Sequence, residues 1–275
     1  MDILDMPTPW ALTHEIGDII SSAPGENFYV TVFSFLSKYI PFSNGHILKY
    51  RDNGAPLVLH DGRPNVYEWT DEYLSGYYLL DPLWLYLKNH ENGDEIYRLD
   101  TLAPDSFTQS SYFKKHYRKA QITDELGWII GSGQDRIVIC LLKRWDSGQF
   151  NEEQIRIAQV LQPIFSSVVK LHETLMSQVQ LSANHNWDGT TDHESPSARI
   201  NAYLLATGND KKTLSDRQTD IVDLILRGHS TESIGLNLSI SAGTVKTHKR
   251  NIYSRLGISS HGELFNLFVK SLGRD

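Results

Sequence analysis

The sequence predicts an α+β domain, in which helices flank an antiparallel sheet, followed by a small all-α domain of four helices. The first prediction rests on short β-compatible segments that are joined by turn signals and closed by one long helix. The second rests on helix-cap residues that recur at short intervals near the C-terminus. Polar residues dominate the segment between the two regions, which is typical of a linker. We therefore divide the chain into residues 1–181, a linker at 182–210 and residues 211–275.

The charge is unevenly distributed along the chain. The net charge is −7, yet residues 211–275 hold ten Lys and Arg against six Asp and Glu, which leaves a net charge of −11 for residues 1–210. Attraction to phosphate acts over a Debye length of about 10 Å. An acidic N-terminal domain is therefore compatible with nucleic-acid binding by the basic C-terminal one.

Composition also limits the cellular setting. No apolar run approaches the roughly 18–20 residues of a membrane span, and the segment Met1–Asp5 lacks the basic start of a secretory signal. We expect a cytoplasmic location and no membrane partner. The single cysteine, Cys140, lies in an apolar run, so the sequence predicts neither a disulfide framework nor a cysteine metal site.

Two helices and a hairpin are predicted first. Apolar residues at helical spacing indicate helices over residues 8–22 and 28–40. The β-compatible runs 45–51 and 56–61 flank Asp52-Asn53-Gly54, a turn signal that predicts their antiparallel pairing.

The segment from Tyr67 to Tyr86 is about three times as rich in aromatic residues as the whole chain. Trp69, Tyr73 and Tyr77 fall at i, i+4 and i+8, which predicts that they share one helix face. Two interpretations remain open: these rings pack a helix on the sheet, or they line a cavity for a small organic ligand.

Asp81 precedes Pro82, which favours an extended backbone at Asp81. Its carboxylate either binds an N–H group of a ligand or forms a local turn. The candidate ligand-binding residues are Trp69, Tyr73, Tyr77, Asp81 and Trp84.

Further strands are predicted over 95–99, 121–130 and 135–145, with a short helix over 111–119. Asn151 and the acidic residues after it predict the start of a long helix that ends near Gln180.

The long helix carries apolar residues at alternating steps of three and four, as in a coiled-coil seam between two chains. A helix that covers its own sheet gives a similar pattern. We favour a mixture, in which the first half packs on the sheet and the second half is available to a second copy of the chain. His172 is then expected to be partly exposed. The seam consists of Ala158, Leu161, Phe165, Val168, His172, Leu175 and Val179.

Cap residues define the four C-terminal helices. Ser215, Ser230 and Ser241 are placed to begin the first three, and a fourth is predicted from about His261 to Ser271. The third helix has a buried apolar side and a basic side, which together with the tight turn before it predicts a helix-turn-helix unit.

These residues closely resemble the DNA-binding domain of the LuxR and FixJ/NarL family of bacterial transcription regulators. The matching positions are Leu214-Ser215-x-Arg217-Gln218, Gly228-x-Ser230, Ile234-x-x-x-Leu238, Ile240-Ser241, Thr244-Val245-Lys246-x-His248 and Asn251-Ile252-x-x-x-Leu256-Gly257. Two positions depart from the family, Gln218 in place of Glu and Gly235 in place of Ala. Gly235 is expected to cost its helix about 1 kcal/mol.

The resemblance implies a role for each exposed side chain of the third helix. Lys246, Thr247 and Arg250 match positions that reach base edges, and Thr244 lies in the same matching segment. Lys249 and Arg255 are placed for phosphates. The expected partner is double-stranded DNA.

The fourth helix of the resembling family pairs two domains. Leu264, Leu267 and Phe268 form the corresponding apolar stripe and are the predicted dimerisation residues. A homodimer would place two recognition helices about one DNA turn, roughly 34 Å, apart. We therefore expect a partly palindromic operator.

The N-terminal domain is open to several assignments. Antiparallel pairs argue against a receiver domain with a parallel sheet and favour a GAF or PAS-type sensor fold. Acyl-homoserine-lactone receptors are an alternative, because Trp69, Tyr73, Asp81 and Pro82 follow their pattern, although the step from Tyr73 to Asp81 is about one residue short.

Motifs of phosphate-binding, hydrolase and zinc enzymes are absent from the sequence, so no enzyme, cofactor or metal is predicted. The function predicted is a DNA-binding transcription regulator whose N-terminal domain senses a small molecule. A ligand-independent DNA-binding dimer is the alternative, and a filled core between residues 66 and 130 would favour it.

Overall fold

The computed structural model describes residues 9–51, 54–62, 69–91, 93–131, 135–180 and 195–273. Its centre is a five-stranded antiparallel sheet with the order β2-β1-β5-β4-β3. The strands lie where the sequence predicts them, and the predicted α+β class is confirmed. Their bounds are Asn44–Tyr50 (β1), Leu57–Asp61 (β2), Glu95–Arg98 (β3), Ile122–Ile130 (β4) and Arg136–Arg144 (β5).

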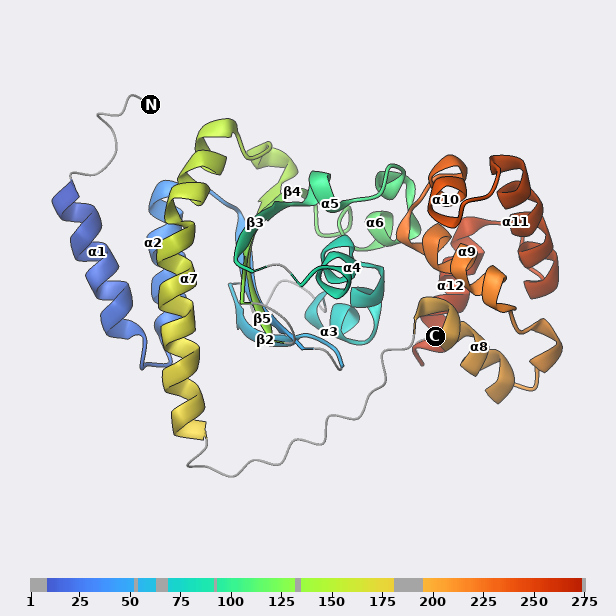
Figure 1. Ribbon diagram of the computed structural model, residues 1–275, viewed down its shortest axis with the longest axis horizontal. Coiled ribbons are helices and arrows are strands. Elements are labelled where there is room, and N and C mark those ends of the chain that lie inside the picture. The colour runs from blue at the N-terminus through green and yellow to red at the C-terminus, as the bar shows by residue number, and fades with distance from the viewer. Residues whose placement is uncertain are drawn as a thin grey trace.

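Two helices, α2 (Phe28–Tyr39) and α7 (Glu152–Gln180), cover one face of the sheet, and α1 (Pro9–Ser22) lies outside them and contacts α2 (Figure 1). The seam of α7 faces inward, because Ala158, Phe165 and Val168 are buried in a core shared with α2 and the sheet. His172 is also buried and stacks on the Phe28 ring at 4.2 Å. The expectation of a partly exposed His172 is therefore wrong. The buried seam of α7 extends from Ala158 as far as His172, because this part of the helix packs on its own domain.

Short helices cover the other face of the sheet. They are α3 (Trp69–Leu74), η2 (Tyr77–Leu80), α4 (Pro82–Asn89), α5 (Leu99–Leu102), η3 (Phe107–Gln109) and α6 (Ser111–Lys115). The prediction that Trp69, Tyr73 and Tyr77 share one helix face is wrong. Gly76, at φ +145°, separates α3 from η2, and a Cβ atom there would lie 2.5 Å from the Leu272 side chain.

The C-terminal domain consists of α8 (Pro196–Ala206), α9 (Asp216–Arg227), α10 (Thr231–Leu238), α11 (Ala242–Leu256) and α12 (His261–Ser271), with a 3₁₀ turn, η5 (Asp210–Lys212). The predicted helices begin at the expected serine caps. Helix α8 falls inside the predicted linker, yet Ile200 and Leu204 are buried, so the helical domain begins before residue 211. The rest of the linker up to residue 194 lies outside the described residues.

The C-terminal domain packs directly on the layer of short helices (Figure 1), and one hydrophobic cluster continues from the sheet into α9–α12. Polar contacts cross the same boundary. The backbone N–H of Ser106 donates to the Gly228 carbonyl at 3.1 Å, and that of Ser230 donates to the Asp105 carboxylate at 3.0 Å. Lys115 donates to Asn266 at 2.7 Å.

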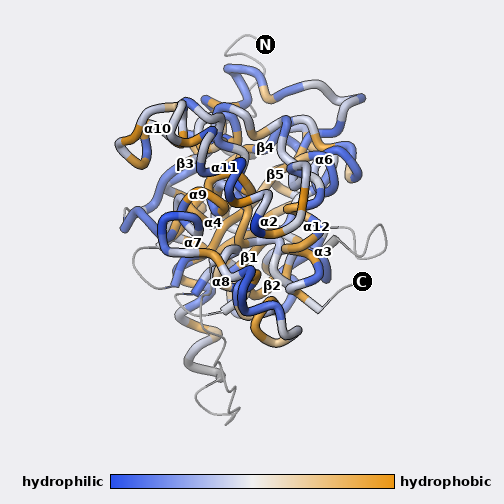
Figure 2. The backbone as a smooth tube through the Cα atoms, turned by 90° about the vertical axis from the view of Figure 1, so that its right-hand side faces the viewer, coloured by the Kyte–Doolittle hydropathy of each residue, from blue (hydrophilic) through white to orange (hydrophobic). Residues whose placement is uncertain are grey.

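Hydrophobic stretches of the chain gather at the centre of the molecule, around β1, β4 and β5, while hydrophilic stretches lie mostly outside them (Figure 2). Among the helices of the described ranges, none has the length and apolar character needed to cross a membrane.

Gly228 tests how tightly the domains fit. It ends α9 at φ +92°, and a Cβ atom there would lie 2.8 Å from Cα of Phe107. Gly208 has a similar φ of +72° but no atom within 4 Å of a Cβ. Alanine at either position is destabilised by about 1–2 kcal/mol, because its side chain disfavours a positive φ. Gly228→Ala should lower the free energy of unfolding by about 1–3 kcal/mol more than Gly208→Ala, because Phe107 must also move.

Urea unfolding of the two variants measures this difference. Equal losses of stability would mean that the backbone of Phe107 does not press on Gly228 in solution.

Candidate functional site

Helix α11 presents the candidate DNA-binding face. The Ser241 hydroxyl caps the helix by accepting from the backbone N–H of Thr244 at 3.0 Å. Val245 and Ile252 are fully buried, which fixes the rotation of the helix about its axis. Lys246, Thr247 and Arg250 lie on the opposite side and are exposed, as their spacing predicts.

Three other predicted DNA-binding residues have contacts within the domain. The Thr244 hydroxyl lies 2.8 Å from that of Ser241, so it belongs to the helix cap. Lys249 is only partly exposed and its ammonium group lies 5.6 Å from the centre of the Tyr253 ring. Arg255 is exposed, and its guanidinium donates to the Thr213 carbonyl at 2.8 Å. Lys246 and Arg250 therefore have the most freedom to reach a ligand.

A second group of predicted residues meets beneath the short helices. The Tyr73 hydroxyl donates to the Asp81 carboxylate at 2.7 Å and lies 2.8 Å from the Tyr50 hydroxyl. The other Asp81 oxygen accepts from the backbone N–H of Leu83 at 2.9 Å and so caps α4. Asp81 thus has the extended backbone that Pro82 predicts. Its carboxylate both caps α4 and accepts the hydrogen bond from Tyr73.

Glu125 is a second buried acid beside this pair, and it is not among the residues predicted from the sequence. It accepts from the Tyr97 hydroxyl at 2.8 Å and the Tyr117 hydroxyl at 3.0 Å. The available signal was a glutamate inside a predicted strand, directly before the mostly apolar run Leu126–Ile130. Asp81 and Glu125 line one cavity with two histidines, and we call it the sheet-side cavity. It is lined by His46, Leu48, Tyr50, Tyr73, Asp81, Leu83, His116, Tyr117, Ile122, Glu125, Val138 and Leu142.

Burial controls ionisation in the sheet-side cavity. Burial and the nearby Glu125 carboxylate raise the pKa of Asp81 to about 7, although the bonds from Tyr73 and Leu83 oppose the shift. Burial also raises the pKa of Glu125. It lowers the pKa of His46 to about 4 and that of His116 to about 3, so both imidazoles are neutral at pH 7. The cavity therefore holds acids and no cationic side chain.

The sheet-side cavity is small. Its free volume is about 10 Å³, enough for about one water molecule. Among the predicted ligand-binding residues, it brings together Tyr73 and Asp81 only. Tyr77 instead contacts Phe265 of α12, with ring centres 5.7 Å apart, and Trp84 packs on Tyr78 at 5.6 Å. The side chain of Trp69 lies outside the described residues.

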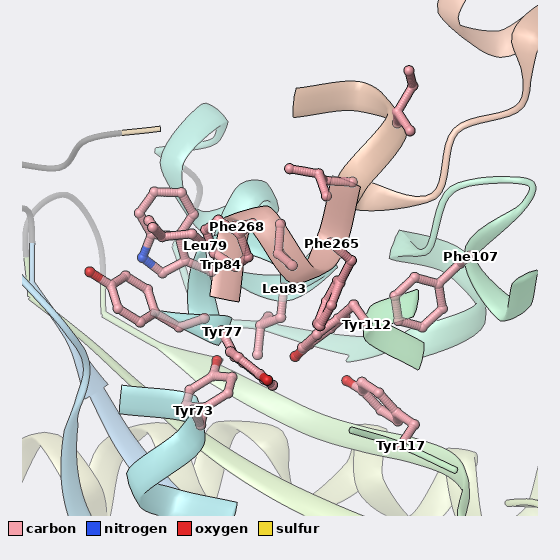
Figure 3. Packing of buried hydrophobic residues seen from close by; sticks show 14 of the residues in the cluster. Tyr73, Tyr77, Leu79, Leu83, Trp84, Phe107, Tyr112, Tyr117, Phe265 and Phe268 are labelled. Atoms are coloured by element: carbon pink, nitrogen blue, oxygen red, sulfur yellow. The ribbon is translucent and has the colours of Figure 1, made fainter. Parts of the chain in front are cut away.

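The predicted dimerisation residues are largely covered within one chain. Leu264 and Phe268 have no exposed surface, and Leu267 is partly buried. Figure 3 shows Phe268 beside Phe265 among the buried residues of the cluster. Helix α12 packs on α8 and α9 of its own domain and on α6 of the N-terminal domain. The predicted dimerisation residues are therefore largely buried within one chain, where α12 packs on helices of both domains.

No group of three or more potential metal-ligating side chains occurs within the described ranges.

Comparison with known proteins identifies the C-terminal domain. Residues 212–268 match the family described as bacterial regulatory proteins, luxR family. An HTH-type transcriptional regulator in the exeN 3'region of Aeromonas salmonicida is 37% identical over 81 residues, which cover 30% of this chain and 40% of that protein. The transcriptional regulatory protein TdiR of Thauera aromatica is 38% identical over 58 residues, covering 21% of this chain and 26% of TdiR.

The chain thus spans less than half the length of these curated relatives. The C-terminal domain is a luxR-family helix-turn-helix domain, as its motifs predict, and this family comprises regulatory proteins and not enzymes.

The N-terminal domain resembles a solved structure in its fold. The LBD domain of VqsR from Pseudomonas aeruginosa superposes with a TM-score of 0.53 at 20% identity, covering 60% of this chain and 96% of that one.

The raised pKa of Asp81 predicts a pH-dependent stability. Between its ordinary value of 3.8 and about 7, the folded protein keeps a proton that the unfolded chain releases, so rising pH lowers the free energy of unfolding. In Asp81→Asn this contribution is absent. The stability of the variant relative to the parent should therefore increase between pH 4 and 7, by up to about 4 kcal/mol.

Chemical denaturation at several pH values measures this difference, in which the shared contributions of His46 and His116 cancel. Asp146→Asn, at an exposed position, controls for the loss of a charge. A difference between Asp81→Asn and the parent that stays constant with pH would contradict a protonated Asp81.

Proposed function

We propose that this protein is a DNA-binding transcription regulator whose N-terminal domain senses a small molecule and controls operator binding by a dimer. The observation that carries the proposal is the exposed face of α11, where Lys246, Thr247 and Arg250 project from a luxR-family domain. An α-helix fits the major groove, and this one has its apolar side buried and its basic side free.

The chemistry of these side chains suits base recognition. Arg250 can donate two hydrogen bonds to guanine, and Thr247 can contact a thymine methyl group. Lys246 adds a positive charge at the same surface. The net charge of +4 in residues 211–275 supports attraction to the phosphate backbone in spite of the acidic remainder of the chain.

For sensing, the proposal rests on the Tyr73–Asp81 pair in the sheet-side cavity. A ligand larger than a water molecule has to displace the layer of short helices above the sheet, because the free volume is about 10 Å³. That layer carries the docking contacts of the C-terminal domain. A ligand that binds the displaced state more tightly would therefore weaken docking.

Packing of the C-terminal domain on the N-terminal domain would control the formation of a dimer. Leu264 and Phe268 are buried within the chain, and α12 contacts the N-terminal α6, so we infer that pairing of two α12 helices requires α12 to leave the N-terminal domain. We propose that the docked chain binds operator weakly and that the undocked chain pairs through α12 and places two recognition helices on a partly palindromic operator.

A ligand-independent DNA-binding dimer is the second candidate, and the nearly filled sheet-side cavity favours it. Operator binding by the full chain, with and without a small-molecule extract of cells, separates the two candidates. Sensing predicts a change in affinity, whereas a ligand-independent regulator binds equally in both.

Arg250 and Lys249 differ in the kind of contact they are proposed to make. Arg250→Ala should weaken specific operator binding by about 1–3 kcal/mol and relax the preference at one base pair, because a base contact is lost. Lys249→Ala should mainly reduce the salt dependence of binding, because a phosphate contact is lost. Titrations of operator variants at several salt concentrations measure both. Unchanged operator affinity in both variants would contradict the assignment of α11.

The proposed control by docking predicts a gain of function. Lys115 is exposed, donates to Asn266 and lies 4.8 Å from the centre of the Phe265 ring, so Lys115→Ala removes contacts to α12. We expect roughly a twofold to thirtyfold higher operator affinity and a larger dimer fraction, since an exposed polar contact and a cation–π contact are each worth up to about 1 kcal/mol.

Lys38→Ala is the matched control, because Lys38 makes an exposed 2.7 Å contact with Glu15 on the opposite side of the sheet. Sedimentation and operator titration measure the effect. Weaker or unchanged operator binding by Lys115→Ala would rule out inhibition by docking.

A further inference from the structure

A second cavity lies between the two domains, and we call it the interdomain cavity. Its free volume is about 110 Å³, room for several water molecules or a small organic molecule. The N-terminal domain supplies most of its wall, and the C-terminal domain supplies the residues on either side of Gly228. The lining residues are Leu80, Asp81, Pro82, Leu85, Leu102, Pro104, Arg227 and His229.

The position of the cavity is fixed by backbone contacts. The Gly228 carbonyl accepts from Ser106, and the N–H of Ser230 donates to Asp105. These bonds join the domains beside Arg227 and His229. The cavity is therefore a feature of the docked arrangement, and it exists only while the two domains are in contact.

Arg227 gives the interdomain cavity its chemical character. Its Nε atom is buried and has no hydrogen-bond partner within the described residues. Burial lowers the pKa of Arg227, and the negative charge of Asp223, one helical turn earlier, opposes that shift. The Asp223 carboxylate accepts a hydrogen bond from the backbone N–H of Ser197 at 2.8 Å, so its contribution to Arg227 is that of a nearby charge. A partly buried guanidinium with an unused Nε–H donor has lost hydration, and a bound anion would replace it.

The acids that line or adjoin the interdomain cavity accept hydrogen bonds from groups other than the Arg227 guanidinium. Both carboxylate oxygens of Asp81 accept hydrogen bonds from Tyr73 and Leu83. Asp105 accepts from Ser230. His229 has its Nδ1 atom 2.9 Å from the Ser233 hydroxyl. The remaining wall is mainly leucine and proline, which suits the apolar part of a ligand.

We propose that the interdomain cavity binds a small organic acid, with its carboxylate on the Arg227 guanidinium and its apolar part against Leu85, Leu102 and Pro104. Because both domains form the wall, the occupant binds the docked arrangement alone and stabilises it. This site is separate from the sheet-side cavity, and its occupant acts in the opposite direction to a ligand that displaces the short helices.

Calorimetric titration of the full chain with benzoate and hexanoate tests the proposal, with benzamide and hexanamide as uncharged counterparts. We expect either benzoate or hexanoate to bind with 1:1 stoichiometry. The corresponding amide should bind at least tenfold more weakly. Arg227→Gln should weaken binding at least tenfold, and Arg227→Lys should restore part of the affinity, because Lys keeps the charge without the planar donors.

Two controls separate a site from a general charge effect. Arg156→Gln removes an exposed arginine of α7 and should bind the carboxylate like the parent. Leu85→Phe keeps Arg227 but reduces the cavity, and it should also lose binding. The thermal unfolding temperature of each variant shows that it is folded.

Three results would overturn the proposal. They are failure of both carboxylates to bind the folded parent, equal binding by the parent and folded Arg227→Gln, and equal binding of a carboxylate and its amide.

Discussion

Helix α12 buries aromatic side chains between two domains, and the arrangement of the whole chain depends on this contact. Phe265 and Phe268 have no exposed surface, and Phe265 meets the Tyr77 ring of the N-terminal domain at 5.7 Å. Burial of each such ring contributes about 1.5–3 kcal/mol. Because the same helix is the proposed dimer contact, its burial within one chain and its pairing between two chains exclude each other.

Asp81 connects the candidate ligand pocket to that contact. Its carboxylate binds Tyr73 at the sheet and caps α4 through the N–H of Leu83, while the same residue lines the interdomain cavity. A change at the sheet therefore reaches the domain boundary through the first turn of one helix. This short path gives the proposed sensing a physical basis, since no long chain of coupled residues is needed.

Local signals made the C-terminal domain predictable. Serine caps and glycines in the left-handed conformation, such as Ser241 and Gly257, define its helices through contacts within a few residues. Contacts distant in sequence explain what was missed. The turn at Gly76 is packed against Leu272, nearly two hundred residues later, and Glu125 is stabilised by Tyr97 and Tyr117 from other elements. The apolar spacing along α7 is the same for a helix that pairs with a second chain and for one that packs on its own sheet, so the sequence does not distinguish the two.

Hydrogen exchange of the segment 105–117 tests most directly whether docking and DNA binding compete. This segment holds Asp105, Ser111 and Lys115, which contact the C-terminal domain. The account predicts faster exchange in the full chain when operator DNA is bound, because α12 leaves the N-terminal domain. Unchanged protection of the segment in saturated operator complexes would show that the chain binds DNA while docked and would contradict the account.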